Sequence, residues 1–226
     1  MNAYLESVRS GYNMAAEGYA DSWRQPHPWL SEEREQFMAR IPAGGSIMDA
    51  GCGPGHDVAY FAERGFRVVG IDNSDAMISL ARRLHPGLDF RIADIVNGDL
   101  PPQSFDAVWA AYVLLHVPLD MQPAALQRLC AVIRAGGVLF VATATAESPE
   151  EINKPIAGLK TSSGEELAVP STRRPGESLL ALAGAYGGIE WSKETKPLPD
   201  RGGALHFLLR CHTEVHADDR VPSSRG

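Results

Sequence analysis

Residues 46–57 of the chain read SIMDAGCGPGHD and place Gly51, Gly53 and Gly55 at alternating positions behind a short apolar run. The run predicts a β-strand, and residues 57–65 have the apolar spacing of a helix. Glycine has no Cβ, so a ligand can approach the backbone of such a turn where any other side chain would intrude. The stretch therefore predicts a strand, a turn and a helix that begins at a ligand site.

Strand-like and helix-like segments alternate from residue 46 onward. The apolar patterns predict further strands at 66–72, 88–94, 105–113 and 138–145, with helices at 57–65, 73–84, 121–133 and 177–187. Two more strand-like runs, 189–198 and 204–213, are typical of an antiparallel hairpin. The predicted fold class is α/β, with three layers and a mostly parallel seven-stranded sheet that ends in a C-terminal antiparallel hairpin.

Composition restricts the partners. The chain has 226 residues, a formal net charge of −7 and scattered Lys and Arg residues, so we expect no nucleic-acid surface. The cysteines lack the paired spacing of a zinc site, and no acid–histidine cluster predicts another metal. No apolar run approaches the roughly 20 residues that span a bilayer, and the first residues do not resemble a secretory signal. We therefore expect a cytoplasmic protein with no membrane partner.

An acid follows the glycine-rich turn at the distance used in nucleotide-binding folds. Asp72 ends the second predicted strand, where a carboxylate accepts ribose hydroxyls. Two ligands fit these features, a dinucleotide and S-adenosylmethionine. The dinucleotide pattern G-x-G-x-x-G requires its third glycine where this chain has His56, which weakens that alternative.

The run D-x-G-x-G-x-G, which begins at Asp49, resembles the first motif of the class I S-adenosylmethionine-dependent methyltransferases. Later segments resemble further motifs of that family, in the family's order: VVGIDNSDAM, RIADI, FDAVWAAYVLLHVP and VIRAGGVLFVAT. The last departs from the usual turn, because Ala135 replaces the common proline and Ile133 the leucine. The resemblance covers residues 10–145 well and implies a Rossmann-like fold.

The resemblance also implies the cofactor and its contacts. S-adenosylmethionine would bind at the glycine-rich turn and leave as S-adenosylhomocysteine. Asp72 would hold the ribose, Met77 would pack near the adenine, and Asp94 would meet the adenine amino group. The implied cofactor-contacting residues are Tyr12, Tyr19, Asp49, Gly51, Gly53, Asp72, Asn73, Met77, Asp94, Ile95, Ala110 and Ala111.

The expected organisation is a single methyltransferase domain over residues 1–226. Residues 147–176 are polar and interrupted by Pro and Gly, which indicates a long loop or lid. The expected parts are an N-terminal helical cap (1–45), the cofactor-binding core (46–145), a lid and helix (146–188), the closing hairpin (189–213) and a frayed tail (214–226).

Aromatic residues are concentrated near the N-terminus, in YNMAAEGYADSW and the residues after it. The stretch resembles the tyrosine-containing helix that closes over the cofactor in many small-molecule methyltransferases. Tyr12 and Tyr19 would lie on one helix face and bond the cofactor's carboxylate or cover its sulfonium, and Tyr19 is also a catalytic candidate. Alternatively, the rings only dock the helix on the core. Trp23, His27 and Trp29 are candidates for a substrate mouth or for an aromatic anchor.

Transfer of a sulfonium methyl group needs a nucleophile held in line, and a base only when the acceptor arrives protonated. His116, just past the fourth strand, is the candidate base, unless its imidazole only orders the cofactor loop. Arg173 and Arg174 either bind an acidic substrate group or are solvated surface residues. His206 and His212 flank the last strand, and we expect them to be structural or exposed.

The sequence therefore predicts methyl transfer from S-adenosylmethionine to an oxygen or nitrogen atom of a small molecule, by in-line displacement at the sulfonium methyl. Two alternatives stay open. One is a macromolecule methyltransferase. The other is a cofactor-binding protein on the same fold with a regulatory or cyclase-like role and no methyl transfer. The chain is expected to be a monomer or a homodimer.

Overall fold

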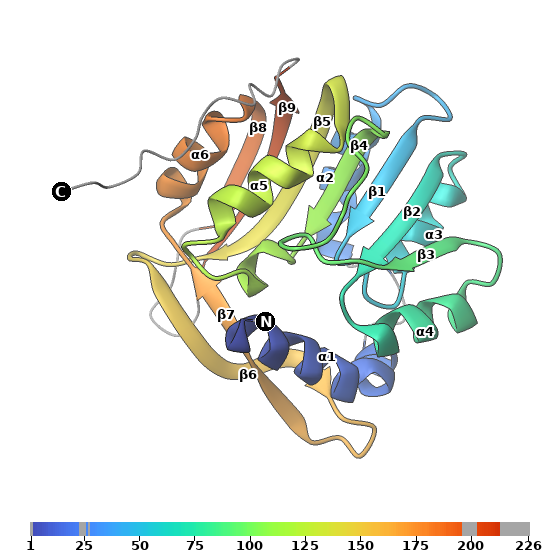
Figure 1. Cartoon of the computed structure of the whole chain (residues 1–226), viewed down its shortest axis with the longest axis vertical. Helices are drawn as coiled ribbons and strands as arrows, with labels where there is room; N and C mark the ends of the chain where they lie inside the picture. Colours follow the sequence, from blue (N-terminus) through green and yellow to red (C-terminus); the bar gives the residue numbers. More distant parts are fainter. Residues whose placement is uncertain (1, 23–25, 27, 196–202, 213–226) are drawn as a thin grey trace.

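The computed structural model of the chain describes residues 2–22, 26, 28–195 and 203–212. The main sheet has seven strands in the order β3-β2-β1-β4-β5-β9-β8 (Figure 1). These strands are β1 (Ser46–Ala50), β2 (Arg67–Asp72), β3 (Asp89–Ile92), β4 (Phe105–Ala111), β5 (Ile133–Thr145), β8 (Gly187–Thr195) and β9 (Gly203–Cys211). Strands β1 to β5 pair in parallel, whereas β9 is antiparallel to β5 and β8 to β9. The predicted sheet and its closing hairpin are confirmed.

Helices cover both faces of this sheet. They are α1 (Ala3–Ser22), α2 (Ser31–Met38), α3 (His56–Ala62), α4 (Asp75–Leu84), α5 (Gln122–Ala131) and α6 (Gly176–Gly184), with the short 3₁₀ turns η1 (Pro28–Leu30) and η2 (Leu114–His116). Helices α5 and α6 pack on one face, and α2 and α3 pack on the other. Helix α1 lies beyond the carboxyl ends of the parallel strands, next to α4 (Figure 1). The three-layer α/β architecture is therefore as predicted.

The two apolar layers follow from the alternation of side chains along the central strands. In β4, Val108 and Ala110 belong to the core beneath α5 and α6. Ala107 and Trp109 belong to the core beneath α2 and α3, and all of these side chains are fully buried. A strand covered on both faces reads as a continuous apolar run, which is the pattern of residues 105–113.

Residues 147–176 differ from the expected long loop, whereas the helix expected after them is present. The segment 147–176 contains β6 (Glu150–Lys160) and β7 (Glu166–Arg173), which form a separate two-stranded antiparallel sheet, and α6 is the expected helix. The β6–β7 hairpin packs against α1 (Figure 1), where Leu159 and Val169 are fully buried. Many other residues of the two strands are exposed, so the segment has too few apolar positions to show a strand pattern.

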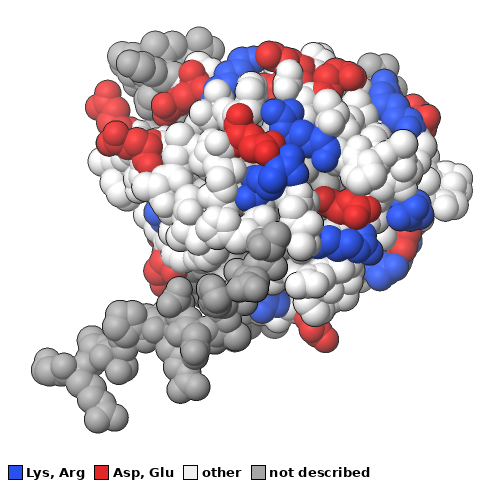
Figure 2. Space-filling view, turned by 90° about the horizontal axis from the view of Figure 1, so that it is seen from above, with Lys and Arg blue, Asp and Glu red and all other residues white. Residues whose placement is uncertain are grey.

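The molecular surface mixes charges of both signs. The face seen from above carries Lys and Arg side chains interspersed with Asp and Glu side chains (Figure 2). Ion pairs join distant segments of the chain, such as Arg40 with Glu190 at 2.9 Å and Arg134 with Asp106 at 3.0 Å. Among the helices of the described residues, none is both long enough and apolar enough to cross a membrane.

Candidate active site

A cleft lies at the carboxyl edge of the parallel strands, between the strand ends and α1. Its empty volume is about 1140 Å³, part of which is open to solvent. Open α/β sheets bind their ligands at this edge. The sequence-predicted residues that line the cleft are Tyr12, Tyr19, Asp49, Gly51, Gly53, Asp72, Asn73, Met77, Asp94, Ile95, Ala111 and His116.

The glycine-rich turn between β1 and α3 forms the floor of the cleft. Gly51 and Gly53 both have a positive φ, 74° and 51°, which residues with a Cβ rarely adopt. A Cβ on Gly51 would lie 2.6 Å from the side chain of Val113, whereas a Cβ on Gly53 would meet nothing within 4 Å. Gly51 therefore allows close packing of the chain on itself, and Gly53 leaves open space for a ligand.

Buried acids surround this turn. The carboxylate of Asp72 accepts hydrogen bonds from Gly53 N at 3.0 Å and from Ser74 N at 2.8 Å, yet burial still raises its pKa. Burial raises the pKa of Asp49 well above its usual value, and the nearby carboxylates of Asp57 and Asp72 raise it further. A cationic ligand would relieve both the burial cost and the repulsion between these acids. The sulfonium and ammonium groups of S-adenosylmethionine have the required charge, so the acids fit this cofactor.

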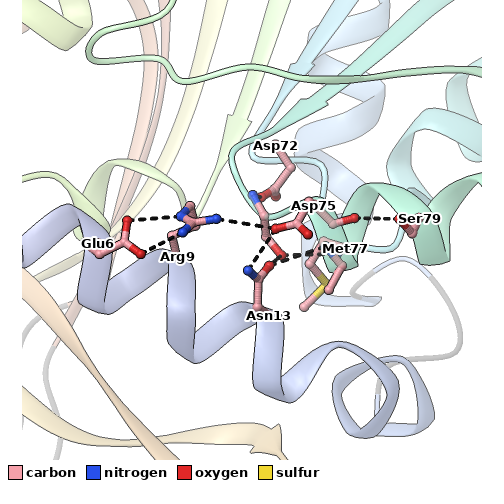
Figure 3. Close-up of polar contacts among 9 residues, drawn as sticks. Glu6, Arg9, Asn13, Asp72, Asp75, Met77 and Ser79 are labelled. Carbon is pink, nitrogen blue, oxygen red and sulfur yellow. Dashed lines mark hydrogen bonds and ion pairs between the residues drawn. The ribbon is translucent and has the colours of Figure 1, made fainter. Parts of the chain in front are cut away.

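Polar contacts tie α1 to the loop after β2, and sequence reasoning missed them. Asn13 Oδ1 accepts a hydrogen bond from Ser74 Oγ at 2.6 Å, and Asn13 Nδ2 donates to Asp75 Oδ1 at 2.8 Å (Figure 3). Arg9 reaches the same carboxylate at 3.4 Å (Figure 3). Ser74 Oγ also accepts the backbone N–H of Met77 and so caps α4. The helix over the cleft is thereby joined to the segment that carries Asp72 and Met77.

One wall of the cleft contains a hydrogen-bonded tyrosine–histidine pair. His116 Nδ1 lies 2.9 Å from the carbonyl oxygen of Pro170, which can only accept, so Nδ1 carries the proton. In the neutral imidazole Nε2 is then an acceptor, and the Tyr12 hydroxyl, 2.7 Å away, donates to it. Burial lowers the pKa of His116 to about 4. Burial also raises the pKa of Tyr12 well above its usual value and that of Tyr19 to about 12, so both hydroxyls keep their protons at neutral pH.

Arg34 on α2, Asp57 on α3 and Trp109 on β4 form a hydrogen-bonded group beside the turn. Arg34 Nε donates to Asp57 Oδ1 at 2.7 Å, and Trp109 Nε1 donates to Asp57 Oδ2 at 3.0 Å. The Arg34 side chain is only 2% exposed, so this is a buried ion pair. Arg34 also lowers the pKa of Asp49 and partly offsets its burial. Sequence reasoning gave no role to Arg34 or Asp57, because the contact joins helices that precede and follow β1.

Tyr112 is a further cleft residue that the sequence did not single out. It follows the end of β4 directly and has a φ of 57°, a costly conformation for a residue with a Cβ. Its backbone N–H donates to Ala142 O at 2.7 Å, and its hydroxyl contacts His206. His206 is buried, although the sequence left open that it is exposed.

The predicted substrate arginines lie outside the cleft wall. Arg173 pairs with Glu150 on the neighbouring strand of the hairpin at 3.4 Å, and Arg174 donates to the backbone carbonyl of Leu119 at 2.9 Å. Neither is among the residues that line the cleft. Of the two alternatives that the sequence left open, the pairing of Arg173 across the β6–β7 hairpin favours a structural role over the binding of an acidic substrate group.

The remaining predicted site features have different outcomes. Ala110 is fully buried in the core rather than in the cleft wall. Trp29 is 47% exposed and does not line the cleft. Trp23 and His27 lie outside the described residues. No group of His, Cys, Asp and Glu side chains within the described ranges could hold a metal ion.

Comparisons with known proteins agree with this geometry. The methyltransferase domain family matches residues 47–137. The chain is 34% identical over 151 residues to the malonyl-(acyl-carrier protein) O-methyltransferase of Enterobacter lignolyticus, an alignment that covers 66% of this chain and 58% of that protein. It is 36% identical over 107 residues to the ubiquinone biosynthesis O-methyltransferase of Stutzerimonas stutzeri, with 45% of each chain covered. The chain thus spans about half the length of these curated relatives.

A solved structure shows the same fold over almost the whole chain. It is the 1,6-didemethyltoxoflavin-N1-methyltransferase of Burkholderia thailandensis, determined with S-adenosylhomocysteine bound, with a TM-score of 0.69 at 20% identity. The match covers 94% of this chain and 92% of that one. The family model and the curated relatives, together with the glycine-rich turn and the acid at the end of β2, show that residues 47–137 form a methyltransferase domain of the class I S-adenosylmethionine-dependent type, and the solved structure shows that the fold extends over almost the whole chain.

Proposed function

We propose that this protein transfers the methyl group of S-adenosylmethionine to an oxygen atom of a small molecule bound in the cleft. The observation that carries the proposal is that the open glycine turn, the buried acids and two tyrosine–histidine pairs meet at one cleft. Both curated relatives described above are named O-methyltransferases, which favours oxygen over nitrogen as the acceptor atom.

The residues at the turn have the capacity to hold the cofactor, which supplies an electrophilic methyl group when bound. Both oxygens of the Asp72 carboxylate accept backbone hydrogen bonds, and the lone pairs that remain can accept ribose hydroxyls. Met77 and Ile95 offer apolar surface in the same cleft, suited to a planar base. Asp94 accepts from Val96 N at 2.7 Å, which holds this loop in place.

Tyr12 and His116 act in this proposal as positioning residues, not as the base. The Nε2 atom of His116 already accepts a hydrogen bond from the Tyr12 hydroxyl, and the low pKa of the imidazole makes it a weak base at neutral pH. The pair instead fixes the Tyr12 hydroxyl at the cleft. Tyr19 stays protonated and is available as a donor to the cofactor's carboxylate.

Helix α1 and the β6–β7 hairpin serve as the cover of the cleft. Gly11 and Gly18 allow the two elements to approach closely, because an added Cβ would lie 2.1 Å from Val169 and 2.2 Å from Lys160 O. A cover packed this tightly excludes water from the methyl group and strengthens the electrostatic contacts inside.

Calorimetric titration with S-adenosylmethionine and S-adenosylhomocysteine tests the cofactor site. Wild-type protein is expected to bind both, and Asp72→Ala to weaken binding at least about tenfold, because the ribose loses charge-assisted hydrogen bonds. Asp89→Ala is the matched control, since Asp89 is half-exposed and pairs with Arg91 on β3. Unchanged affinity in Asp72→Ala would remove Asp72 from the site.

Isotopically labelled methyl transfer to a panel of carboxylic acids, phenols, amines and a peptide mixture tests the reaction. Product from acids or phenols supports the proposal. Product from amines alone moves the acceptor to nitrogen, and product from peptides alone favours a macromolecule methyltransferase. Cofactor binding without any product would support the non-methylating alternative and overturn the proposal.

A further inference from the structure

A second tyrosine–histidine pair lies at the cleft, and it has a carboxylate behind it. The Tyr112 hydroxyl is 3.1 Å from His206 Nε2, and His206 Nδ1 is 2.8 Å from Glu33 Oε1. Tyr112 lines the cleft, whereas Glu33 is fully buried. The three residues form a hydrogen-bonded chain from the cleft into the protein.

The direction of the hydrogen bonds follows from their partners. Burial raises the pKa of Glu33, but the hydrogen bond from His206, a backbone hydrogen bond and the nearby positive charges together lower it below its ordinary value, so the group is a carboxylate at neutral pH and can only accept. Nδ1 of His206 therefore carries a proton. In the neutral ring Nε2 is then free to accept from the Tyr112 hydroxyl. The chain is arranged to move a proton from Tyr112 toward His206.

Tyr112 is held near the place where the methyl group is expected. It lies between Ala111, which lines the cleft, and Val113, whose side chain packs on Gly51 of the glycine turn. The left-handed backbone of Tyr112 is maintained by its hydrogen bond to Ala142. A costly conformation that the surrounding structure enforces at a binding cleft is a reason to seek a role for the side chain.

One carboxylate and one ammonium group lie close to His206. Glu33 faces it from α2, and Lys193 is its register partner on β8. The Lys193 ammonium group lies 3.5 Å from Glu33 Oε1 and 2.9 Å from Glu32. On the β5 side the neighbours are apolar, with the Phe140 ring centroid 6.4 Å away. Glu33 is thus the carboxylate in direct contact with the ring, whereas His116 has only a neutral carbonyl.

We propose, on the basis of the proposed O-methyl transfer, that Tyr112 is the catalytic residue that deprotonates the acceptor hydroxyl, with His206 and Glu33 as positioning residues behind it. The acceptor O–H proton passes to Tyr112 Oη while the Tyr112 proton passes to His206 Nε2. The electron pair of the acceptor oxygen forms the new O–CH₃ bond, and the pair of the broken C–S bond remains on sulfur. The imidazolium beside Glu33 later returns its proton through Tyr112 to solvent.

The ligand-free protein provides a test that does not depend on turnover. Nitrogen NMR of the histidine rings, with the His206 signal identified by its loss in His206→Gln, reports which nitrogen carries the proton. The expected result at neutral pH is protonated Nδ1 and unprotonated Nε2. A proton on Nε2 would make His206 a donor to Tyr112 and would overturn the proposal.

Tyr112→Phe tests the catalytic step, with Tyr60→Phe as the matched control because the Tyr60 hydroxyl contacts Glu35 at the exposed surface. With an acceptor whose pKa exceeds the assay pH, Tyr112→Phe is expected to lower kcat about 100-fold at unchanged KM and unchanged cofactor affinity. The loss should shrink across a series of acceptors of falling pKa and vanish for one already ionised. An equal loss for every acceptor, or no loss, would contradict the proposal.

Glu33→Gln separates proton transfer from a structural role. Loss of the negative charge lowers the basicity of His206, so the rising limb of the kcat–pH profile should move to lower pH with a lower plateau. An unmoved limb would contradict the role of Glu33. If the proposed function itself is wrong, wild-type protein will methylate no acceptor. The NMR result does not depend on methyl transfer and therefore tests the hydrogen-bonded chain separately.

Discussion

Each of two walls of the cleft contains a hydrogen-bonded tyrosine–histidine pair. The two pairs differ in the group that accepts a hydrogen bond from the other ring nitrogen of the histidine. On the neutral wall, Tyr12 and His116 are backed by the carbonyl oxygen of Pro170. On the charged wall, Tyr112 and His206 are backed by the Glu33 carboxylate. Burial without a nearby anion lowers the pKa of His116 to about 4, whereas Glu33 provides a buried anion for the second imidazole. The partner behind a histidine, more than the tyrosine in front of it, decides whether the pair can accept a proton.

The walls also differ in how they are held together. The neutral wall is formed by α1, η2 and β7, whose contacts are close backbone packing at glycines and uncharged hydrogen bonds. The charged wall also includes the buried ion pair of Arg34 and Asp57. Removing a charged side chain should therefore destabilise the charged wall most. Acid pH and added side-chain volume should instead destabilise the neutral wall.

The largest effect is expected for Arg34→Met on the charged wall. It leaves Asp57 and Asp49 without their cation, and breaking a buried ion pair lowers the free energy of unfolding by about 4 kcal/mol. Arg64→Met is the control, because Arg64 is exposed and stacks on the Tyr60 ring at 3.4 Å, a contact of about 1 kcal/mol or less. Urea unfolding of the two variants measures the difference, and similar losses would show that Arg34 acts only through stacking.

The second-largest effect is expected at acid pH, which should destabilise the neutral wall. The folded-state pKa of His116 lies below its ordinary value of 6.5, so folding favours the neutral ring, and its stabilising contribution is present above pH 6.5 and lost as pH falls toward about 4. The loss amounts to about 3 kcal/mol over that range. Urea unfolding at several pH values should show a shallower slope in His116→Gln than in wild-type protein.

This pH test also separates the walls. The pKa of Glu33 lies below its ordinary value of 4.5, so its contribution is present above pH 4.5 and is lost only as pH falls further. The loss of stability between pH 6.5 and 4.5 is therefore assigned to His116 and not to protonation of Glu33. Equal slopes in wild-type protein and His116→Gln would refute a buried neutral His116.

Added volume between α1 and the hairpin should have a smaller effect. The Cβ of Gly11→Ala would lie 2.1 Å from Val169 Cγ1, and overpacking of this kind costs about 1–3 kcal/mol. A double-mutant cycle with Val169→Ala should show a favourable coupling of about 1 kcal/mol, because the smaller side chain makes room. Gly184→Ala in α6 is the control, since its Cβ would meet nothing within 4 Å. Strictly additive effects would mean that the contact relaxes at no cost.

The smallest effect is expected for Arg173→Ala. Its ion pair with Glu150 is partly exposed, with the two side chains 28% and 40% accessible, so its loss should change the free energy of unfolding by about 0.5 kcal/mol. KM for the acceptor should stay the same, because Arg173 does not line the cleft. A raised KM for an acidic acceptor would restore the substrate role that the sequence suggested.

The sequence by itself determined the parallel core and the position of the cleft. Apolar runs at strand length, the Gly51–Gly55 turn and Asp72 are local patterns, and the edge at which parallel strands place their loops follows from the fold class. Of the twelve expected cleft-lining residues, Asp49, Gly51, Gly53 and Asp72 belong to these local patterns, whereas most of the others were implied by the resemblance to the methyltransferase family. The β6–β7 hairpin escaped prediction because it buries only a few side chains against α1 and shows no clear period.

Only the tertiary structure decided which side chains became partners. Tyr112, His206 and Glu33 meet because β5 and β9 are neighbours in the sheet, with register Ala142 to His206, and because α2 packs on that face. Tyr12 meets His116 because α1 returns across the strand ends. Periodicity along the chain indicates which face of an element is buried, but not which distant element covers it. The chemistry assigned to each histidine therefore depended on contacts that no local pattern encodes.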